Sequence, residues 1–158
     1  MRHGIAEDGG PSKPDADRAL TAEGRKKLRQ VLQLATEVGA DPSLILTSVL
    51  KRAAQTAEIA RDVFKHDKEA VPSGALALGA PVEQVWDEVR AHRDERAILL
   101  VGHNPQFSEL AAYLLGSREL QVDLKKGSLF RVDIEGFSAR PHGVLRWYLT
   151  AKLAVRHN

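Results

Sequence analysis

The segment that decides the fold is Ala97-Ile98-Leu99-Leu100-Val101-Gly102-His103-Asn104-Pro105, an apolar run followed directly by polar residues and a proline. A continuous apolar run of this length is typical of a strand that is buried on both faces of a parallel sheet. Pro105 predicts the start of a helix, because proline fits the first helical turn, where its missing N–H is not needed. We therefore predict a strand followed by a helix, with His103 at their junction.

The rest of the chain alternates between the same two patterns. Apolar residues at helical spacing predict helices, and short apolar runs bounded by turn residues predict strands. Alternating strands and helices favour a mainly parallel sheet with helices on both faces, which is a three-layer α/β/α sandwich. The predicted order is a helix between Thr21 and Gly39, a strand at 44–46, a helix at 53–64, a helix at 82–89, the strand at 97–101, a helix ending at Gly116, and strands at 128–134 and 144–150.

Composition limits the classes of function. The 158 residues, 43% of them hydrophobic, predict one domain that spans residues 1–158. Basic residues exceed acidic ones by only 23 to 21, so we expect no nucleic-acid partner. Cysteine is absent, which excludes a disulfide framework and a thiolate nucleophile. No run approaches the roughly 20 apolar residues of a membrane span, so we expect a cytoplasmic monomer without membrane contact.

Charged and polar residues gather where the predicted strands end. Arg2-His3-Gly4 stands near the start, Ser48 and Arg52 follow the strand at 44–46, and Gly102-His103-Asn104-Pro105 follows the strand at 97–101. Functional groups of open α/β sheets collect at the carboxyl ends of the strands. Two arginines and two histidines meeting there suit a phosphoryl dianion, because guanidinium groups offer forked donors to phosphate oxygens.

These residues are poor candidates for a metal site. The sequence has neither an acidic cluster nor a group of histidine and cysteine ligands, so we expect no metal and no other cofactor. The remaining histidines share no metal-ligand spacing, and we expect them to face the solvent; they are His66, His92, His142 and His157.

Taken together, these segments closely resemble the histidine phosphatase superfamily, which carries an R-H-G triplet on its first strand. The smallest members, the SixA-like phosphohistidine phosphatases, are the best match. The resemblance extends over nearly the whole chain and implies a phosphoglycerate mutase-like fold. It also rests on Arg18-Ala19-Leu20-Thr21, on Arg52 with Gln55-Thr56-Ala57-Glu58, and on Leu145-Arg146-Trp147.

The resemblance implies a role for each matching residue. His3 would be the nucleophile, and Arg2, Arg52 and a protonated His103 would complete the phosphate pocket. Arg18, Gly4, Ser48 and Asn104 would bind substrate. We expect Gly4 to let the backbone pass close to the phosphate. Nearby guanidinium groups would keep His3 neutral, as an attacking imidazole must be.

The family pattern is incomplete in one place that bears on the substrate. Many histidine phosphatases have a glutamate as general acid before the third helix, but the corresponding stretch here is Ser73-Gly74-Ala75-Leu76-Ala77-Leu78-Gly79. An alkoxide leaving group needs a proton, whereas imidazole, with a pKa of about 6.5 or above, needs less help. We therefore expect a protein phosphohistidine, or a small phosphoramidate, as substrate. Glu83, Glu7 and Asp8 stay open as substitute acids.

Two other functions fit the same residues. One is a phosphomonoesterase of the same superfamily that acts on a small phosphate ester, and the other is a non-catalytic module that binds phosphate. A second departure concerns the start, because Met1 directly precedes the triplet where the family has an apolar strand. We expect this first strand to be missing or truncated before Met1.

Overall fold

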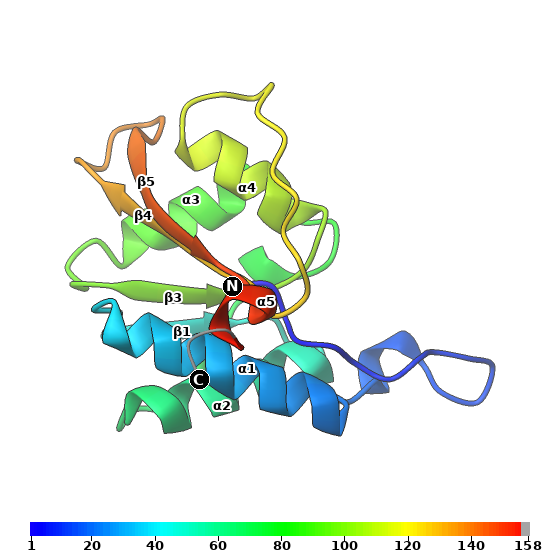
Figure 1. The fold of residues 1–158 in the computed structure, drawn as a ribbon. Coiled ribbons are helices and arrows are strands. Elements are labelled where there is room, and N and C mark those ends of the chain that lie inside the picture. Colours follow the sequence, from blue (N-terminus) through cyan, green and yellow to red (C-terminus); the bar gives the residue numbers. More distant parts are fainter. Residues whose placement is uncertain (156–158) are drawn as a thin grey trace.

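Three parallel strands form the sheet on which the helices pack (Figure 1). In the computed structural model, which describes residues 1–155, the central strand β1 (Leu44–Thr47) pairs with β2 (Val71–Pro72) on one side and β3 (Ile98–Val101) on the other. The α/β class and the parallel sheet are confirmed. Strand β2 was not predicted, because it is an exposed edge strand of two residues and its proline favours a turn reading.

A separate antiparallel pair closes the fold. Strands β4 (Leu129–Ile134) and β5 (Gly143–Leu149) agree with the two predicted strands near the end of the chain. They form their own two-stranded sheet and share no strand pairing with β1–β3. Figure 1 shows this pair crossing above β3.

The predicted helices are all present. Thr21 begins the first of them, since its hydroxyl oxygen accepts a hydrogen bond of 2.9 Å from the Gly24 N–H. A short fifth helix after Thr150 and two 3₁₀ helices were not predicted, because segments of three or four residues carry no periodicity. The helices are α1 (Ala22–Glu37), α2 (Lys51–Phe64), α3 (Val82–Ala91), α4 (Gln106–Leu114) and α5 (Ala151–Ala154), with η1 (Asp15–Asp17) and η2 (Gly74–Leu76). Among the described residues, no helix has the length and apolar character needed to cross a membrane.

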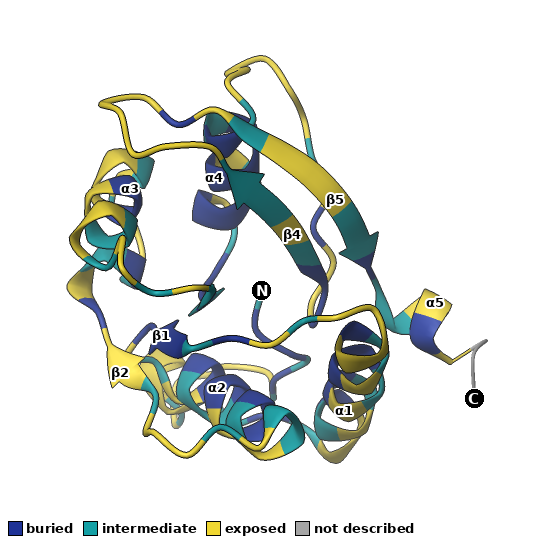
Figure 2. Ribbon diagram, turned by 90° about the vertical axis from the view of Figure 1, so that its left-hand side faces the viewer, coloured by how far each residue is buried: buried dark blue, intermediate teal, exposed yellow. Residues whose placement is uncertain are grey.

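Alternation of side chains along the strands gives the sheet two buried faces. Ile45 of β1 packs in a cluster with α1 and α2, whereas Leu44 and Leu46 pack in a second cluster with α3 and α4. Successive side chains of a strand point to opposite faces, so a run that is apolar throughout must be covered on both sides. Figure 2 shows the buried stripes of α1 and α2 on one side and those of α3 and α4 on the other.

Residues 1–3 connect the two sheets at the edge where the predicted site residues lie. The Gly102 N–H donates to the Met1 carbonyl (3.1 Å), and the His3 N–H donates to the Gly102 carbonyl (2.9 Å). On the other side, the Arg2 N–H donates to the Ser128 carbonyl (3.1 Å). His3 therefore lies between the end of β3 and the start of β4.

The chain after His3 lies against α1 with very little space between them. A Cβ atom added at Gly24 would lie 2.2 Å from the Ile5 carbonyl oxygen, which is far inside van der Waals contact. Because the obstacle is backbone, the contact is relieved only if α1 moves away from the segment that carries His3.

We predict that Gly24→Ala destabilises the protein, although alanine normally favours a helix interior over glycine by about 1 kcal/mol. Overpacking of this kind costs about 1–3 kcal/mol. The measurement is chemical unfolding of both proteins. Gly74→Ala is the control, because a Cβ there meets nothing within 4 Å. Equal or greater stability of Gly24→Ala would contradict the close approach.

Candidate active site

His3 is buried, and one hydrogen bond fixes its tautomer. Its side chain is 6% exposed, and Nδ1 lies 2.7 Å from the carbonyl oxygen of Gly4. A carbonyl can only accept, so Nδ1 carries the proton and Nε2 keeps its lone pair. Burial lowers the pKa of His3 to about 3, and the positive charges of Arg52 and Arg2 act in the same direction. This direction agrees with the expected neutral imidazole, but its main cause is burial rather than neighbouring charge.

His103 lies beside His3, with 5.1 Å between the ring centroids. Its Nε2 is 2.8 Å from the Ser48 hydroxyl, while Nδ1 has no hydrogen-bond partner among the described residues. Burial lowers the pKa of His103 to about 4, and Arg52 lowers it further while Asp15 opposes the shift. These shifts favour a neutral His103 in the site without a bound anion, and its protonation beside a phosphoryl group stays a prediction.

Arg52, on the first turn of α2, is the buried cation of the site. Its Nε is 3.4 Å from Nε2 of His3 and is oriented to donate to it. The two terminal nitrogens donate to Asp15, Nη1 to the backbone carbonyl (2.8 Å) and Nη2 to Oδ2 (3.0 Å). Asp15 was not predicted as a site residue. The one local sign of its role in the sequence is that it stands three residues before Arg18, across η1.

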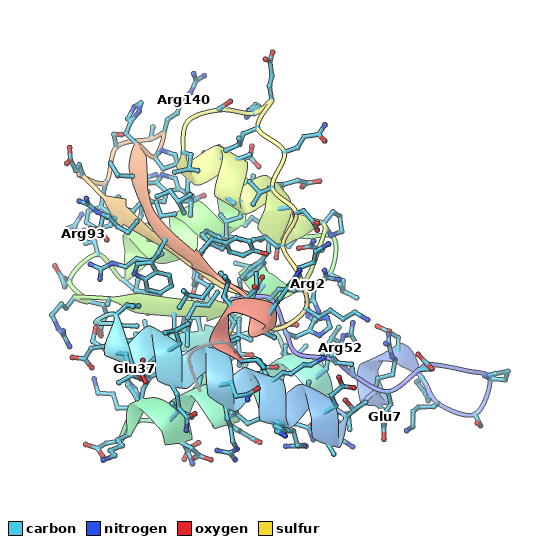
Figure 3. All side chains as sticks on the ribbon, viewed as in Figure 1. Arg2, Glu7, Glu37, Arg52, Arg93 and Arg140 are labelled. Carbon is cyan, nitrogen blue, oxygen red and sulfur yellow. The ribbon has the colours of Figure 1, made fainter. Side chains whose placement is uncertain are left out.

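Arg18 approaches the site through the same aspartate. Its Nη1 donates to Oδ1 of Asp15 (2.9 Å), and its Nε donates to the Glu7 carbonyl (2.6 Å). The positive charge of Arg2 also acts on His3, and its Nη1 donates to the Leu124 carbonyl (2.7 Å). In Figure 3, Arg2 and Arg52 lie near each other on the side where the chain from Glu7 onward projects from the body. The two strand-end arginines and two histidines are thus brought together.

Packing leaves no room for a side chain at Gly4. A Cβ there would lie 2.5 Å from Leu28 Cδ1 and 3.2 Å from Leu20 Cδ2, both of which are buried. A close approach of this backbone to phosphate stays a prediction. The Gly4 N–H is also occupied, because it donates to the Thr56 hydroxyl (3.1 Å).

Ser48 and Asn104 hold other groups of the site. The fully buried Ser48 hydroxyl contacts His103, and the Asn104 side-chain amide lies 3.5 Å from the Leu124 carbonyl that also accepts from Arg2. A direct contact of either residue with substrate stays a prediction. The Leu124 carbonyl, between Arg2 and Asn104, is a part of the site that sequence reasoning missed, because it belongs to an irregular segment without periodicity.

Three predicted site residues each carry a buried polar atom that has no hydrogen-bond partner among residues 1–155. These atoms are Nε of Arg2, Nδ1 of His103 and Oδ1 of Asn104. Buried polar groups in native proteins almost always have partners, so a cluster of exceptions marks a place built for a ligand. Guanidinium and imidazole N–H groups suit an oxyanion.

A cavity of about 280 Å³ opens beside His103. The stretch where the family has its glutamate forms part of its wall, through Ala77, Leu78 and Gly79. The carboxylate in this wall is that of Glu109, which is exposed. Of the substitute acids left open, Glu83 pairs with Arg118 and Glu7 pairs with Lys13, so both carboxylates are directed at other partners.

The remaining histidines were expected to face the solvent, which holds fully for one of the three that are described. His66 and His92 are half-buried and His142 is exposed, while His157 lies outside the described residues. Within residues 1–155, no group of three or more potential ligands is arranged to hold a metal ion.

Residues 1–76 match the family model of the histidine phosphatase superfamily (branch 1). An uncharacterized protein of Picosynechococcus sp. is 34% identical over 135 residues, which are 82% of this chain and 79% of that protein. The serine/threonine-protein phosphatase Pgam5 of Drosophila ananassae is 37% identical over 83 residues, 52% of this chain and 28% of that protein.

Solved structures resemble the fold over almost the whole chain. The protein histidine phosphatase SixA in complex with tungstate has a TM-score of 0.85 at 24% identity, over 97% of this chain and 96% of SixA. The alpha-ribazole phosphatase of Shigella flexneri has a TM-score of 0.65 at 21% identity, over 92% of each chain. The phosphoglycerate mutase-like fold is confirmed by this agreement.

We predict that stability falls between pH 7 and pH 5 because of the two histidines. In the unfolded chain both imidazoles bind a proton below a pH of about 6.5, whereas in the folded protein His3 does so only near 3 and His103 only near 4. Their contribution is complete above pH 6.5 and is lost as the pH falls. At pH 5 the loss is on the order of 2 kcal/mol for each histidine.

The measurement is chemical unfolding of the wild type and of a His3→Asn, His103→Asn double variant at pH 7 and pH 5. We expect a smaller pH dependence for the variant. Burial also lowers the pKa of the Met1 amino group to about 5, but this group and the depressed carboxylates are common to both proteins and cancel in the comparison. The same loss of stability in both proteins would contradict burial of neutral imidazoles.

Proposed function

We propose a function from the premise that this chain belongs to the histidine phosphatase superfamily. In this proposal the protein is a phosphatase that removes phosphate from phosphohistidine in a protein. The reaction passes through a phosphohistidine intermediate on His3. The observation that carries the proposal is the state of His3. It is a buried, neutral imidazole whose Nε2 lone pair is directed toward donors from Arg52 while its other nitrogen is bound to Gly4.

The first chemical step follows from this arrangement. His3 Nε2 attacks phosphorus, a P–N bond to His3 forms, and the P–N bond to the substrate imidazole breaks. Negative charge is spread over the three transferring oxygens, and the guanidinium groups of Arg2 and Arg52 stabilise it. The other ring nitrogen of the substrate imidazole carries a proton taken from solvent before the bond breaks, so the electron pair of the broken bond stays on a neutral imidazole leaving group.

Hydrolysis then restores the enzyme. Water attacks the phosphorus of phosphorylated His3, the P–Nε2 bond breaks, and inorganic phosphate leaves with the water oxygen. His103 supports both steps as a hydrogen-bond donor in one of its two neutral tautomers. If the Ser48 hydroxyl donates to Nε2, the proton of His103 lies on Nδ1, the atom without a partner, where it can donate to a phosphoryl oxygen.

The leaving-group side supports phosphohistidine as substrate. The cavity next to His103 is lined by Ala77, Leu78 and Gly79, from the stretch where the family has its glutamate. These three residues have no side-chain proton to give to a leaving group. A phosphate monoester of an alcohol would expel a strongly basic alkoxide there, whereas imidazole leaves with a pKa of about 6.5 or above.

One observation favours a second function, hydrolysis of a small phosphate ester. The exposed carboxylate of Glu109 lines the same cavity as His103 and is the group placed to protonate an alcohol leaving group. Under this alternative, Glu109→Gln would abolish ester hydrolysis. Under the main proposal, it would leave the turnover of a phosphohistidine peptide unchanged.

We predict that brief reaction with labelled phosphoramidate leaves phosphate on the protein that is labile in acid and stable in base. His3→Ala should abolish both label and turnover, because no other group holds a free lone pair at this position. His103→Ala should keep the nucleophile and slow turnover by about 10²-fold or more, as expected when one preorganised donor is lost. Turnover by Arg52→Lys should also be slower, since an ammonium group keeps the charge but lacks the paired N–H donors of a guanidinium.

Protein labelling is followed by quenched-flow and mass spectrometry, and turnover is compared for a phosphohistidine peptide and para-nitrophenyl phosphate. A faster reaction of the peptide supports the proposed substrate. Label or turnover that persists in His3→Ala would place the phosphate on another residue and reject the mechanism. Tungstate binding without turnover of any substrate would identify a phosphate-binding module.

We also predict that chelators leave turnover unchanged. Two guanidinium groups and the imidazole donor neutralise the phosphoryl charge in the proposed mechanism, so that no divalent ion is needed. The measurement is the initial rate after dialysis against EDTA, with and without added Mg²⁺, Mn²⁺ or Zn²⁺. Loss of activity that one of these ions restores would contradict the proposal.

A further inference from the structure

We propose that Asp15 is a positioning residue that directs one edge of Arg52 toward the transferring phosphoryl group, and that Arg18 acts through Asp15. This inference rests on the proposed function for the identity of the reacting atoms. It gives a role to the projecting segment before α1, which contains η1, and it changes the expected role of Arg18 from binding substrate to holding Asp15.

The geometry of the Arg52 guanidinium carries the argument. A guanidinium is planar, and its five N–H groups point in fixed directions. Asp15 occupies the terminal fork, with its backbone carbonyl on Nη1 (2.8 Å) and its Oδ2 on Nη2 (3.0 Å). Once that fork is held, the orientation of the plane is set. The remaining edge, which contains Nε, then faces Nε2 of His3 at 3.4 Å.

The edge that faces His3 is the useful one for phosphoryl transfer. Phosphorus must approach Nε2 of His3 to be attacked, so its oxygens come to lie around that atom. The N–H of Nε and the second N–H of one terminal nitrogen form a side-on fork, which can donate to two of these oxygens. Asp15 keeps its hydrogen bonds to the terminal fork at the same time. Asp15 therefore directs Arg52 without competing for its phosphate-facing donors.

Asp15 needs support of its own, because it lies on a short helix without buried residues. Its side chain is 52% exposed, whereas that of Arg52 is 5% exposed. Arg18 supplies the support, with Nη1 on Oδ1 (2.9 Å) and Nε on the Glu7 carbonyl (2.6 Å). Hydrogen bonds from Arg18 and then Arg52 lower the pKa of Asp15 and keep it charged.

The chain of contacts is thus Arg18, Asp15, Arg52 and His3 in that order. Each link joins a cation to the next group through a charge-assisted hydrogen bond or a donor–lone-pair contact. If Arg18 acts only through this chain, the effects of removing Arg18 and removing Asp15 cannot be independent. A direct contact of Arg18 with phosphate would make the two effects multiply.

The experiment is a double-mutant cycle with Asp15→Asn, Arg18→Gln and the combined variant, measured by titration calorimetry with tungstate and by kcat and KM for para-nitrophenyl phosphate. Asp17→Asn is the matched control, since it removes the same charge from the same helix and Asp17 forms no ion pair within the described part of the chain. Thermal unfolding of each variant shows whether the fold is retained.

We expect Asp15→Asn to weaken tungstate binding by about tenfold or more, the range for hydrogen bonds to charged groups. Arg18→Gln should weaken it less, the combined variant should be no weaker than Asp15→Asn, and Asp17→Asn should match the wild type. Effects of Asp15→Asn and Arg18→Gln that multiply would overturn the inference. Unchanged or tighter binding by Asp15→Asn would overturn it as well.

The tungstate measurement also separates this inference from the proposed function. A wild type that binds tungstate and hydrolyses no substrate would reject the phosphatase and leave the positioning chain to be decided by the binding cycle. A wild type that binds no tungstate would reject both.

Discussion

The site depends on the backbone hydrogen bonds that hold residues 1–3 against Gly102. The Gly102 N–H donates to the Met1 carbonyl, its carbonyl accepts from the His3 N–H, and Arg2 is tied on its other side to Ser128. These bonds bring two histidines that are 100 residues apart in the sequence to a ring separation of 5.1 Å. Gly102 also has to be small, because a Cβ there would lie 2.3 Å from the Phe107 ring. Backbone pairing and close packing therefore place His3 beside His103.

The electrostatic character of the site follows from that placement. Burial disfavours a charged imidazole, and the adjacent guanidinium groups disfavour it further, so both histidines are held neutral at pH 7. For His3 this is the form that the proposed mechanism needs, and we expect the stability of the fold at acid pH to be reduced as a consequence. Asp15 partly balances Arg52, so the site stays cationic enough to attract a dianion without accumulating unpaired positive charge.

Much of this arrangement could be predicted from the sequence, because it depends on local patterns. The apolar runs before Thr47-Ser48 and Gly102-His103 indicate parallel strands, and the carboxyl ends of such strands meet at one edge. Asp15 could not be found in this way, since its contact with Arg52 joins positions 37 residues apart across a segment without periodicity. The lowered pKa of His103 could not be predicted for a related reason, because it depends on burial, and burial is a property of the assembled fold.

The contacts of Gly4 link the fold to the chemistry. Its lack of a side chain makes room for Leu28 of α1, its N–H binds Thr56 of α2, and its carbonyl accepts the Nδ1 proton of His3. The residue that allows two helices to pack against the segment is thus also the one that selects the tautomer of His3. A shift of Gly4 would disturb helix packing and the His3 ring together. Packing therefore holds the tautomer of His3 that leaves Nε2 with its lone pair, the form that the proposed attack on phosphorus requires, and it does so with backbone atoms, whose positions are far less free than those of an orienting side chain.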